Sequence, residues 1–486
     1  MRDNPILGSN KSNVNDPCHN RARIAGQHRR VIVRMMAPVR QNGSAGGPAA
    51  GPERPIASNH PDQAKSGAAG PGTERQADFG RVLKRVLLFL AVLGPGQIVM
   101  MADTDVGSIV TAAQSGARWG YELLPLQILL IPVLFIVQEL TVRLGIFTGK
   151  GHGELIREHY GKGWGWVSVG GLAISILGAV VTEFSGIAGV GELMGVPRAI
   201  SLTLAAGFLL LLVWAGSYRR VELIAFALGL FETAFLWVAL VSHHHTEWLA
   251  QGFRLSPWRA ADYRYLVAAN IGAVIMPWMI FFQQSAIVDK RLGREHLHHA
   301  RWDTAIGSVL TQLVMMAVMV TTAALGLHHG RRSLETVGQI SRALTPVLGA
   351  NIGRLVFSLG ILGAALVAII VTALAAAWGI GEMTGYKHSL EYHPREAPWF
   401  YGVYAAAVVG SAILVDRAPD LIALNLAIEV MNALLLPLVL GFLILLAARA
   451  MAQPHRLRGA YLWIVTAVCL ATSSLGIYCA LSGIKW

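Results

Sequence analysis

Charged residues are scarce in this sequence. Asp, Glu, Lys and Arg together make up 14% of its 486 residues, whereas soluble domains usually carry roughly a quarter. Hydrophobic residues account for 54%, and the mean hydropathy is +0.51. Water cannot be the only solvent of such a chain, which excludes a wholly soluble protein.

Residue patterns that several enzyme classes require are also missing. The three cysteines, Cys18, Cys469 and Cys479, form no CxxC pair, which argues against disulfides and thiolate metal sites. The sequence has no HExxH motif, and the stretch Gly379-Ile380-Gly381-Glu382 lacks the Lys and the Ser or Thr of a phosphate-binding loop. We therefore expect neither enzymatic activity nor a cofactor.

Long apolar runs dominate the rest of the sequence. Stretches of about 20 residues, enough to cross a hydrocarbon core of roughly 30 Å, recur from residue 86 onward. Eleven of them predict an all-α polytopic membrane protein in contact with the lipid bilayer. Their approximate bounds are 86–118, 122–147, 164–188, 198–216, 221–241, 265–287, 303–327, 345–381, 399–415, 420–448 and 459–482.

The N-terminal segment differs in kind from these spans. Residues 1–80 are rich in Gly, Pro, Ser, Asn and charge and have no apolar periodicity, which predicts a disordered tail before a transmembrane domain at 81–486. The net charge of +12 lies mainly in this tail and in alternate interhelical loops. This pattern indicates topology, not nucleic-acid binding, and predicts a cytoplasmic N-terminus for a multi-pass protein of the inner membrane.

The first span is interrupted by polar and helix-breaking residues. It contains Gly94-Pro95-Gly96 and then two carboxylates, Asp103 and Asp105, near its middle. An Asp at a helix centre costs about 2.5 to 3.5 kcal/mol on insertion scales, so such residues usually face a cavity, an ion or a partner. Gly107 favours local unwinding of the helix.

The sixth span is interrupted in a similar way. Pro277 removes a helical hydrogen bond, which frees a carbonyl near Ala273 as a ligand. Met276 adds a thioether, and soft ligands favour transition metals over Ca²⁺ and Mg²⁺. Broken helices five spans apart are typical of transporters built from two inverted five-helix repeats.

Other polar residues within the spans receive a structural interpretation. Glu139, Glu232, Asp303 and Gln312 either line the permeation path or pair with neighbouring helices; we favour pairing, although an acid inside the membrane is a functional candidate by default. Histidine clusters at 243–245, 298–299 and 328–329 are expected to be solvated polar loops.

The motifs around both breaks resemble those of the natural resistance-associated macrophage protein (NRAMP) divalent-metal transporters. The matching residues are Gly94-Pro95-Gly96, Asp105-Val106-Gly107-Ser108, Thr111, Gly116-Ala117, Gly120-Tyr121, Gln138, Arg143-Leu144-Gly145, Thr148-Gly149, Gly272-Ala273 and Met276-Pro277. The resemblance implies a LeuT-like fold with a first repeat at about 86–241, a second at about 265–448 and an extra helix at about 459–482.

The resemblance also implies a set of metal ligands. By position these are Asp105, Ser108, Ala273 and Met276. The family uses a Gln about eight residues before a Pro in its tenth helix, and counting back from the Pro of the tenth span reaches Glu429.

Several positions depart from the family pattern. Val106 replaces a Pro, Ser108 replaces an Asn, and Trp278 stands where a proton-linked His is usual. In the third span, aligning the family's Glu with Glu183 places Val180 where the family has an Asp. Proton coupling therefore stays open.

Two acids go beyond the usual set. Asp103 and Glu429 would strengthen the negative field around an ion or accept protons, and we take Asp103 and Glu183 as candidate proton-binding or supporting residues. The sequence predicts secondary-active transport of a divalent transition metal, Mn²⁺ or Fe²⁺ first, by alternating access. The alternatives are a carrier of Mg²⁺ or another hard cation, and an uncoupled or channel-like carrier of the same fold.

Overall fold

The computed structural model describes residues 94–214, 218–241, 257–329, 333–345, 348–390 and 392–483. They belong to one compact unit, Arg75–Trp486. The predicted disordered tail, the start of the first span and the histidines at 243–245 lie outside the described residues.

Every regular element in these ranges is a helix. The first part of the chain forms α3 (Pro95–Asp103), α4 (Val106–Trp119), α5 (Leu124–Thr148), α6 (His152–Leu193), α7 (Arg198–Trp214), α8 (Tyr218–Gly229), η1 (Leu230–Glu232) and α9 (Thr233–Val241). The second part forms α11 (Ala261–Val274), α12 (Pro277–Asp289), η3 (Arg294–His296), α13 (Leu297–His329), α14 (Val337–Leu344), α15 (Ala350–Thr384), α16 (Pro398–Asp416), α17 (Leu421–Arg449) and α18 (Gly459–Gly483).

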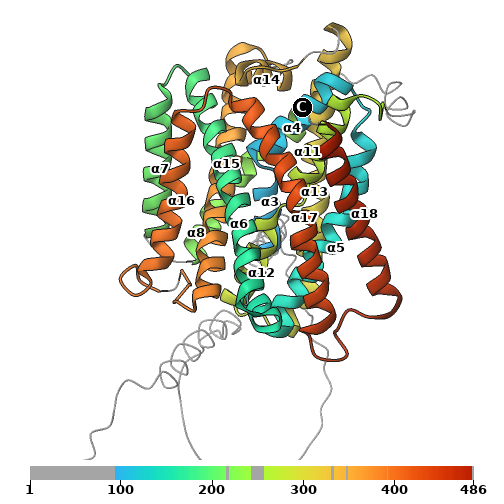
Figure 1. Cartoon of the computed structure of the whole chain (residues 1–486). Coiled ribbons are helices and arrows are strands. Elements are labelled where there is room, and N and C mark those ends of the chain that lie inside the picture. The colour runs from blue at the N-terminus through green and yellow to red at the C-terminus, as the bar shows by residue number, and fades with distance from the viewer. Residues whose placement is uncertain are drawn as a thin grey trace, which may run out of the picture. The chain divides into compact units, whose positions relative to one another are not determined.

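The predicted multi-pass helical architecture is confirmed. Within the described ranges, nine helical segments are long and apolar enough to span a membrane, and α7 is a shorter apolar helix. The first span, divided into α3 and α4, completes the predicted set of eleven. Figure 1 shows α7 and α16 at one edge of the bundle, α18 at the other and α3 near the middle. The outward side chains include Leu240, 84% exposed, and Trp463, 74% exposed, as a lipid-facing surface requires.

Close helix crossings hold the broken spans in place. A Cβ on Gly116 of α4 would overlap the Met319 carbonyl and the Thr322 hydroxyl of α13. A Cβ on Gly272 of α11 would overlap the Glu429 carbonyl of α17. Small residues allow backbones to approach this closely inside a membrane bundle, where apolar burial alone does not drive helix association.

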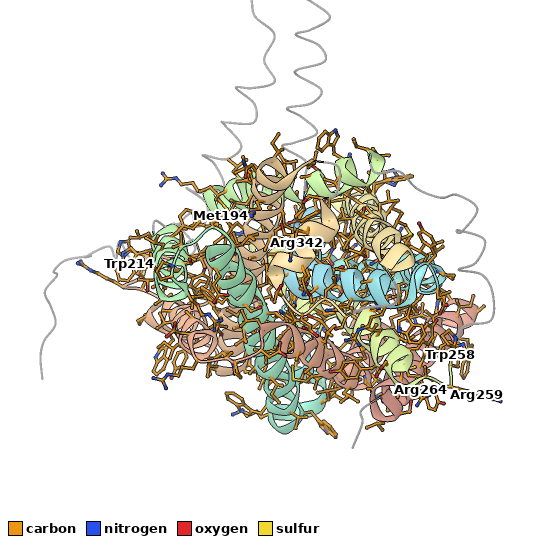
Figure 2. All side chains as sticks on the ribbon, turned by 90° about the horizontal axis from the view of Figure 1, so that it is seen from above. Met194, Trp214, Trp258, Arg259, Arg264 and Arg342 are labelled. Carbon is orange, nitrogen blue, oxygen red and sulfur yellow. The ribbon has the colours of Figure 1, made fainter. Side chains whose placement is uncertain are left out.

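Two elements differ from the sequence prediction. Helix α6 begins at His152, about three turns before the predicted span, and is kinked at Gly161, whose φ of 87° suits glycine. The short helix α14 lies in a predicted loop, where the Thr336 hydroxyl accepts a hydrogen bond from the Gln339 backbone N–H at 3.2 Å. Seen from above, Arg342 of α14 lies near the middle of the view (Figure 2).

The fifth span contains a turn of 3-10 helix, which the sequence did not indicate. Its α8 and α9 are joined by the single 3-10 turn η1, which ends at Glu232, and the backbone stays right-handed helical on both sides of the turn. Helix α8 packs against α3, and η1 packs against α15.

Candidate ion-binding site

The break in the first span lies at Thr104 and Asp105. Helix α3 ends at Asp103, Thr104 leaves helical geometry with φ −82° and ψ 46°, and Asp105 is extended with ψ 177°. The Asp105 Oδ1 accepts a hydrogen bond from the Ser108 backbone N–H at 2.7 Å. Asp105 is therefore the N-cap of α4, where the helix dipole stabilises a negative charge. Asp103 has the opposite placement, because a carboxylate at a helix C-terminus is disfavoured unless a cation is near.

The break in the sixth span exposes the predicted carbonyl. Ile275 and Met276 are extended between α11 and α12, and Pro277 is the first residue of α12. Because Pro277 has no N–H, the Ala273 carbonyl lacks its helical partner. It accepts a hydrogen bond from the Ser108 hydroxyl at 3.0 Å instead. The two broken helices therefore meet directly at these residues.

The Met276 thioether lies in the same break. Its side chain is 1% exposed, and its Sδ accepts a hydrogen bond from the Trp278 indole Nε1 at 3.1 Å. The Trp278 indole is a donor that cannot accept a proton. A metal ion bound at the sulfur would compete with this indole donor.

Buried carboxylates surround the first break. Asp103, Asp105, Glu183 and Glu429 are each at most 1% exposed. The Glu183 Oε2 accepts a hydrogen bond from the Val106 backbone N–H at 3.2 Å. Both oxygens of Asp103 and one oxygen of each other acid accept no hydrogen bond from a described donor. Buried polar atoms are normally satisfied, so these oxygens are available to bind a cation or a proton.

Glu429 approaches the break from α17. The Asn432 side chain donates a hydrogen bond to its Oε2 at 3.2 Å. A Cβ on Gly107 would overlap the Glu429 Oε1, so a glycine at 107 leaves room for this carboxyl beside the start of α4. The structure thus brings Glu429 together with Asp105, as the helix-ten count suggested.

The ligand types at the junction are mixed. Among the described residues, no group of three or more His, Cys, Asp or Glu side chains is arranged to hold a metal ion. A cation here would therefore need ligands of other types, and the Ala273 carbonyl, the Ser108 hydroxyl and the Met276 sulfur supply them. This mixture of hard oxygens and one soft sulfur can coordinate a bare cation.

Three of the acids expected to pair with neighbours can be compared with the structure. Glu139 binds Arg143 at 2.7 Å and Arg301 at 2.6 Å, and the Asp303 carboxylate accepts hydrogen bonds from the Gly96 and Gln97 backbone N–H groups at 3.0 and 3.3 Å. Both make structural contacts, because the first links helices and the second caps α3. Glu232 has no such ion pair among the described residues, and its apolar context gave no signal of its position.

The other polar predictions have different outcomes. Neither side-chain amide atom of Gln312 has a described hydrogen-bond partner. His298 and His299 lie in the first turn of α13, not in a loop. The side chains of the histidines at 328–329 lie outside the described set.

The fold and the paired helix breaks define a multi-pass membrane transporter of LeuT-like architecture. A family model described as natural resistance-associated macrophage protein-like (Nramp) matches residues 96–482. The chain belongs to the Nramp family, whose members are transporters and not enzymes.

Known relatives agree with this assignment. This chain is 30% identical to the divalent metal cation transporter MntH of Klebsiella pneumoniae over 292 residues, which are 59% of this chain and 70% of the relative. A manganese transporter of Eremococcus coleocola has a similar fold, with a TM-score of 0.63 at 19% identity over 81% of this chain and 87% of that chain. A nucleobase-cation-symport-1 family transporter has a TM-score of 0.51 at 15% identity, over 80% of this chain and 90% of that chain.

Proposed function

We propose that this protein carries a divalent transition-metal ion, Mn²⁺ or Fe²⁺ first, across the membrane by alternating access. The observation that carries the proposal is the junction of the two broken helices, where the Ser108 hydroxyl contacts the freed Ala273 carbonyl at 3.0 Å. Asp105 and Met276 belong to the same two breaks. The names of the bacterial relatives, a divalent metal cation transporter and a manganese transporter, support this substrate class.

Helix ends add to the attraction for a cation. The C-terminal end of α11, at Val274, and that of α3, at Asp103, carry the negative ends of their helix dipoles. Half-helices that end at mid-membrane use such ends and their freed carbonyls to replace the hydration shell of an ion. Glu429 places a further carboxylate beside the start of α4.

The thioether supports a transition metal as the substrate. Sulfur binds transition metals better than it binds Mg²⁺ or Ca²⁺, which prefer oxygen. The competing proposal is a carrier of Mg²⁺ or another hard cation. Two observations favour it: oxygens of Asp103 and Glu429 accept no hydrogen bond from a described donor, and the Trp278 indole already donates a hydrogen bond to the Met276 sulfur. Metal competition distinguishes the two.

The test is metal uptake into proteoliposomes that contain the full-length protein. We expect uptake of Mn²⁺ that Fe²⁺ inhibits more strongly than Mg²⁺ or Ca²⁺ does. Asp105→Ala should abolish uptake, because it removes the carboxylate at the break. A matched control is Asp416→Ala, which removes an exposed acid at the end of α16 and should leave uptake unchanged. Parental uptake by Asp105→Ala would show that the ion binds elsewhere.

We further propose the inner membrane as the location, a cytoplasmic N-terminus, and repeats at about 86–241 and 265–448 with an extra helix at about 459–482. The excess of Lys and Arg in alternate loops supports the orientation. The break in α3–α4 and the break in α11–α12, which open corresponding helices of the two repeats, support the division.

A further inference from the structure

Glu232 is a buried acid that the proposed metal site does not use. It ends the 3-10 turn η1 in the middle of the fifth span and is 3% exposed. Its Oε1 accepts no hydrogen bond from a described donor. The ion pair that the structure shows for the fifth span joins Lys290 to Glu222, not to Glu232. An acid that has no ion pair among the described residues of a membrane bundle is costly and marks a functional position.

A small pocket connects Glu232 to the break in the first span. It lies between α3, the fifth span and α13, and its polar lining residues are Gln97, Thr104, Glu232, Thr233 and Thr311. Glu232 of the fifth span and Thr104, which follows the end of α3, line the same pocket. Thr104 is the residue between Asp103 and Asp105, so this pocket brings Glu232 beside the break.

The third span brings a different acid to the break. Val180 is a fully buried aliphatic residue of α6, and it precedes Glu183 by one helical turn. Glu183 contacts the break at Val106, whereas Glu232 shares a pocket with Thr104, from a different helix.

We propose that Glu232 is the group that takes up and releases the proton exchanged during metal transport, and that the pocket it shares with Thr104 is the route to the broken segment. The step is a simple protonation, in which the carboxylate accepts a proton from water and later returns it. The inference rests on the proposed function, since it needs a metal ion as the second cation.

The surrounding charges explain how metal and proton would be coupled. Asp103 and Asp105 stand on either side of Thr104 at the α3–α4 break, and Glu183 of α6 contacts the same break at Val106. The pocket's lining residues from α13 carry no charge, and no described lining residue is basic. A divalent ion bound at Asp105 would offset the negative charge of the acids at this break, which favours release of a proton from Glu232.

The test measures protons and metal together. Proteoliposomes with an internal pH dye receive an inward Mn²⁺ gradient, and the ratio of proton flux to Mn²⁺ uptake is compared among variants. Glu232→Gln keeps the size of the side chain but cannot bind a proton. We expect this variant to take up Mn²⁺ and to lose the accompanying proton flux. Glu192→Gln, which neutralises a side chain 47% exposed and distant in the fold, should keep the parental ratio.

The outcomes separate the two proposals. A parental proton-to-metal ratio in Glu232→Gln overturns the assignment of Glu232. Mn²⁺ uptake by the parent without proton flux overturns the proton role and leaves metal transport standing, whereas no uptake of any divalent metal overturns the proposed function itself. If Glu232→Gln does not fold, Glu232→Asp replaces it. A shifted pH midpoint of uptake in that variant supports the assignment, and an unchanged midpoint overturns it.

Discussion

The packing of Gly107 against Glu429 gives a sharp test of the ion site. A Cβ at position 107 would overlap the Glu429 Oε1, lie 3.1 Å from its Cδ and lie 3.4 Å from the Thr182 Cγ2. Gly107 is helical and has no positive φ. Ala is therefore compatible with the backbone there, where it would otherwise gain about 1 kcal/mol in helix propensity.

The steric overlap of the added Cβ costs more free energy than the helix propensity gains. Overpacking a close-packed interior costs typically about 1 to 3 kcal/mol, and the cheapest relief is to move the Glu429 carboxyl away from the break, because it is the end of a flexible side chain. We expect Gly107→Ala to weaken Mn²⁺ binding by about 5- to 150-fold, the affinity change that this energy represents. In a Glu429→Ala background the overlapping atoms are gone, so adding Gly107→Ala should change the affinity by less than about twofold.

Calorimetric titration of the purified protein with Mn²⁺ would measure this coupling. The cycle needs the parent, both single variants and the double variant. Gly207→Ala on α7 is a matched control, because its added Cβ meets no atom within 4 Å, and it should keep the parental affinity. If the two substitutions weaken binding independently, so that their free energies add in the double variant, Glu429 does not lie beside the break and the reasoning is refuted.

Three further predictions follow from the same contacts. Met276→Ala should reduce the preference for Mn²⁺ over Mg²⁺ more than it reduces total uptake, and an unchanged competition profile would remove the thioether from the site. Gly272→Ala should lower thermal stability by about 1 to 3 kcal/mol because its Cβ meets the α17 backbone, whereas Gly476→Ala, with its nearest atom at 3.5 Å, should be neutral. Deletion of residues 1–78 should leave uptake intact, and a large loss would assign the tail a role in transport.

Local chemistry made part of the site predictable. Pro277 lacks an N–H wherever it stands, so the loss of a partner by the Ala273 carbonyl could be deduced before any packing was known. An Asp at the centre of an apolar run is costly in every bilayer, which identified Asp105.

Other features carried no local signal. The 3-10 turn at the end of α8 lies in an apolar stretch whose composition reads as one continuous helix. Helix α14 was hidden in a polar segment between two spans. Both depend on neighbours, because α14 packs on α13 and α15, and η1 packs on α15.

The sequence by itself determined the membrane solvent, the order of the spans, and the two breaks, because hydropathy and the missing N–H of Pro277 act within a single segment. Only the tertiary structure decided that the Ser108 hydroxyl meets the Ala273 carbonyl, that Glu429 fills the space beside Gly107, and that Glu232 and Thr104 line one pocket. These contacts join helices far apart in the chain, and their register is set by the close packing of small residues between helices, which no local pattern encodes.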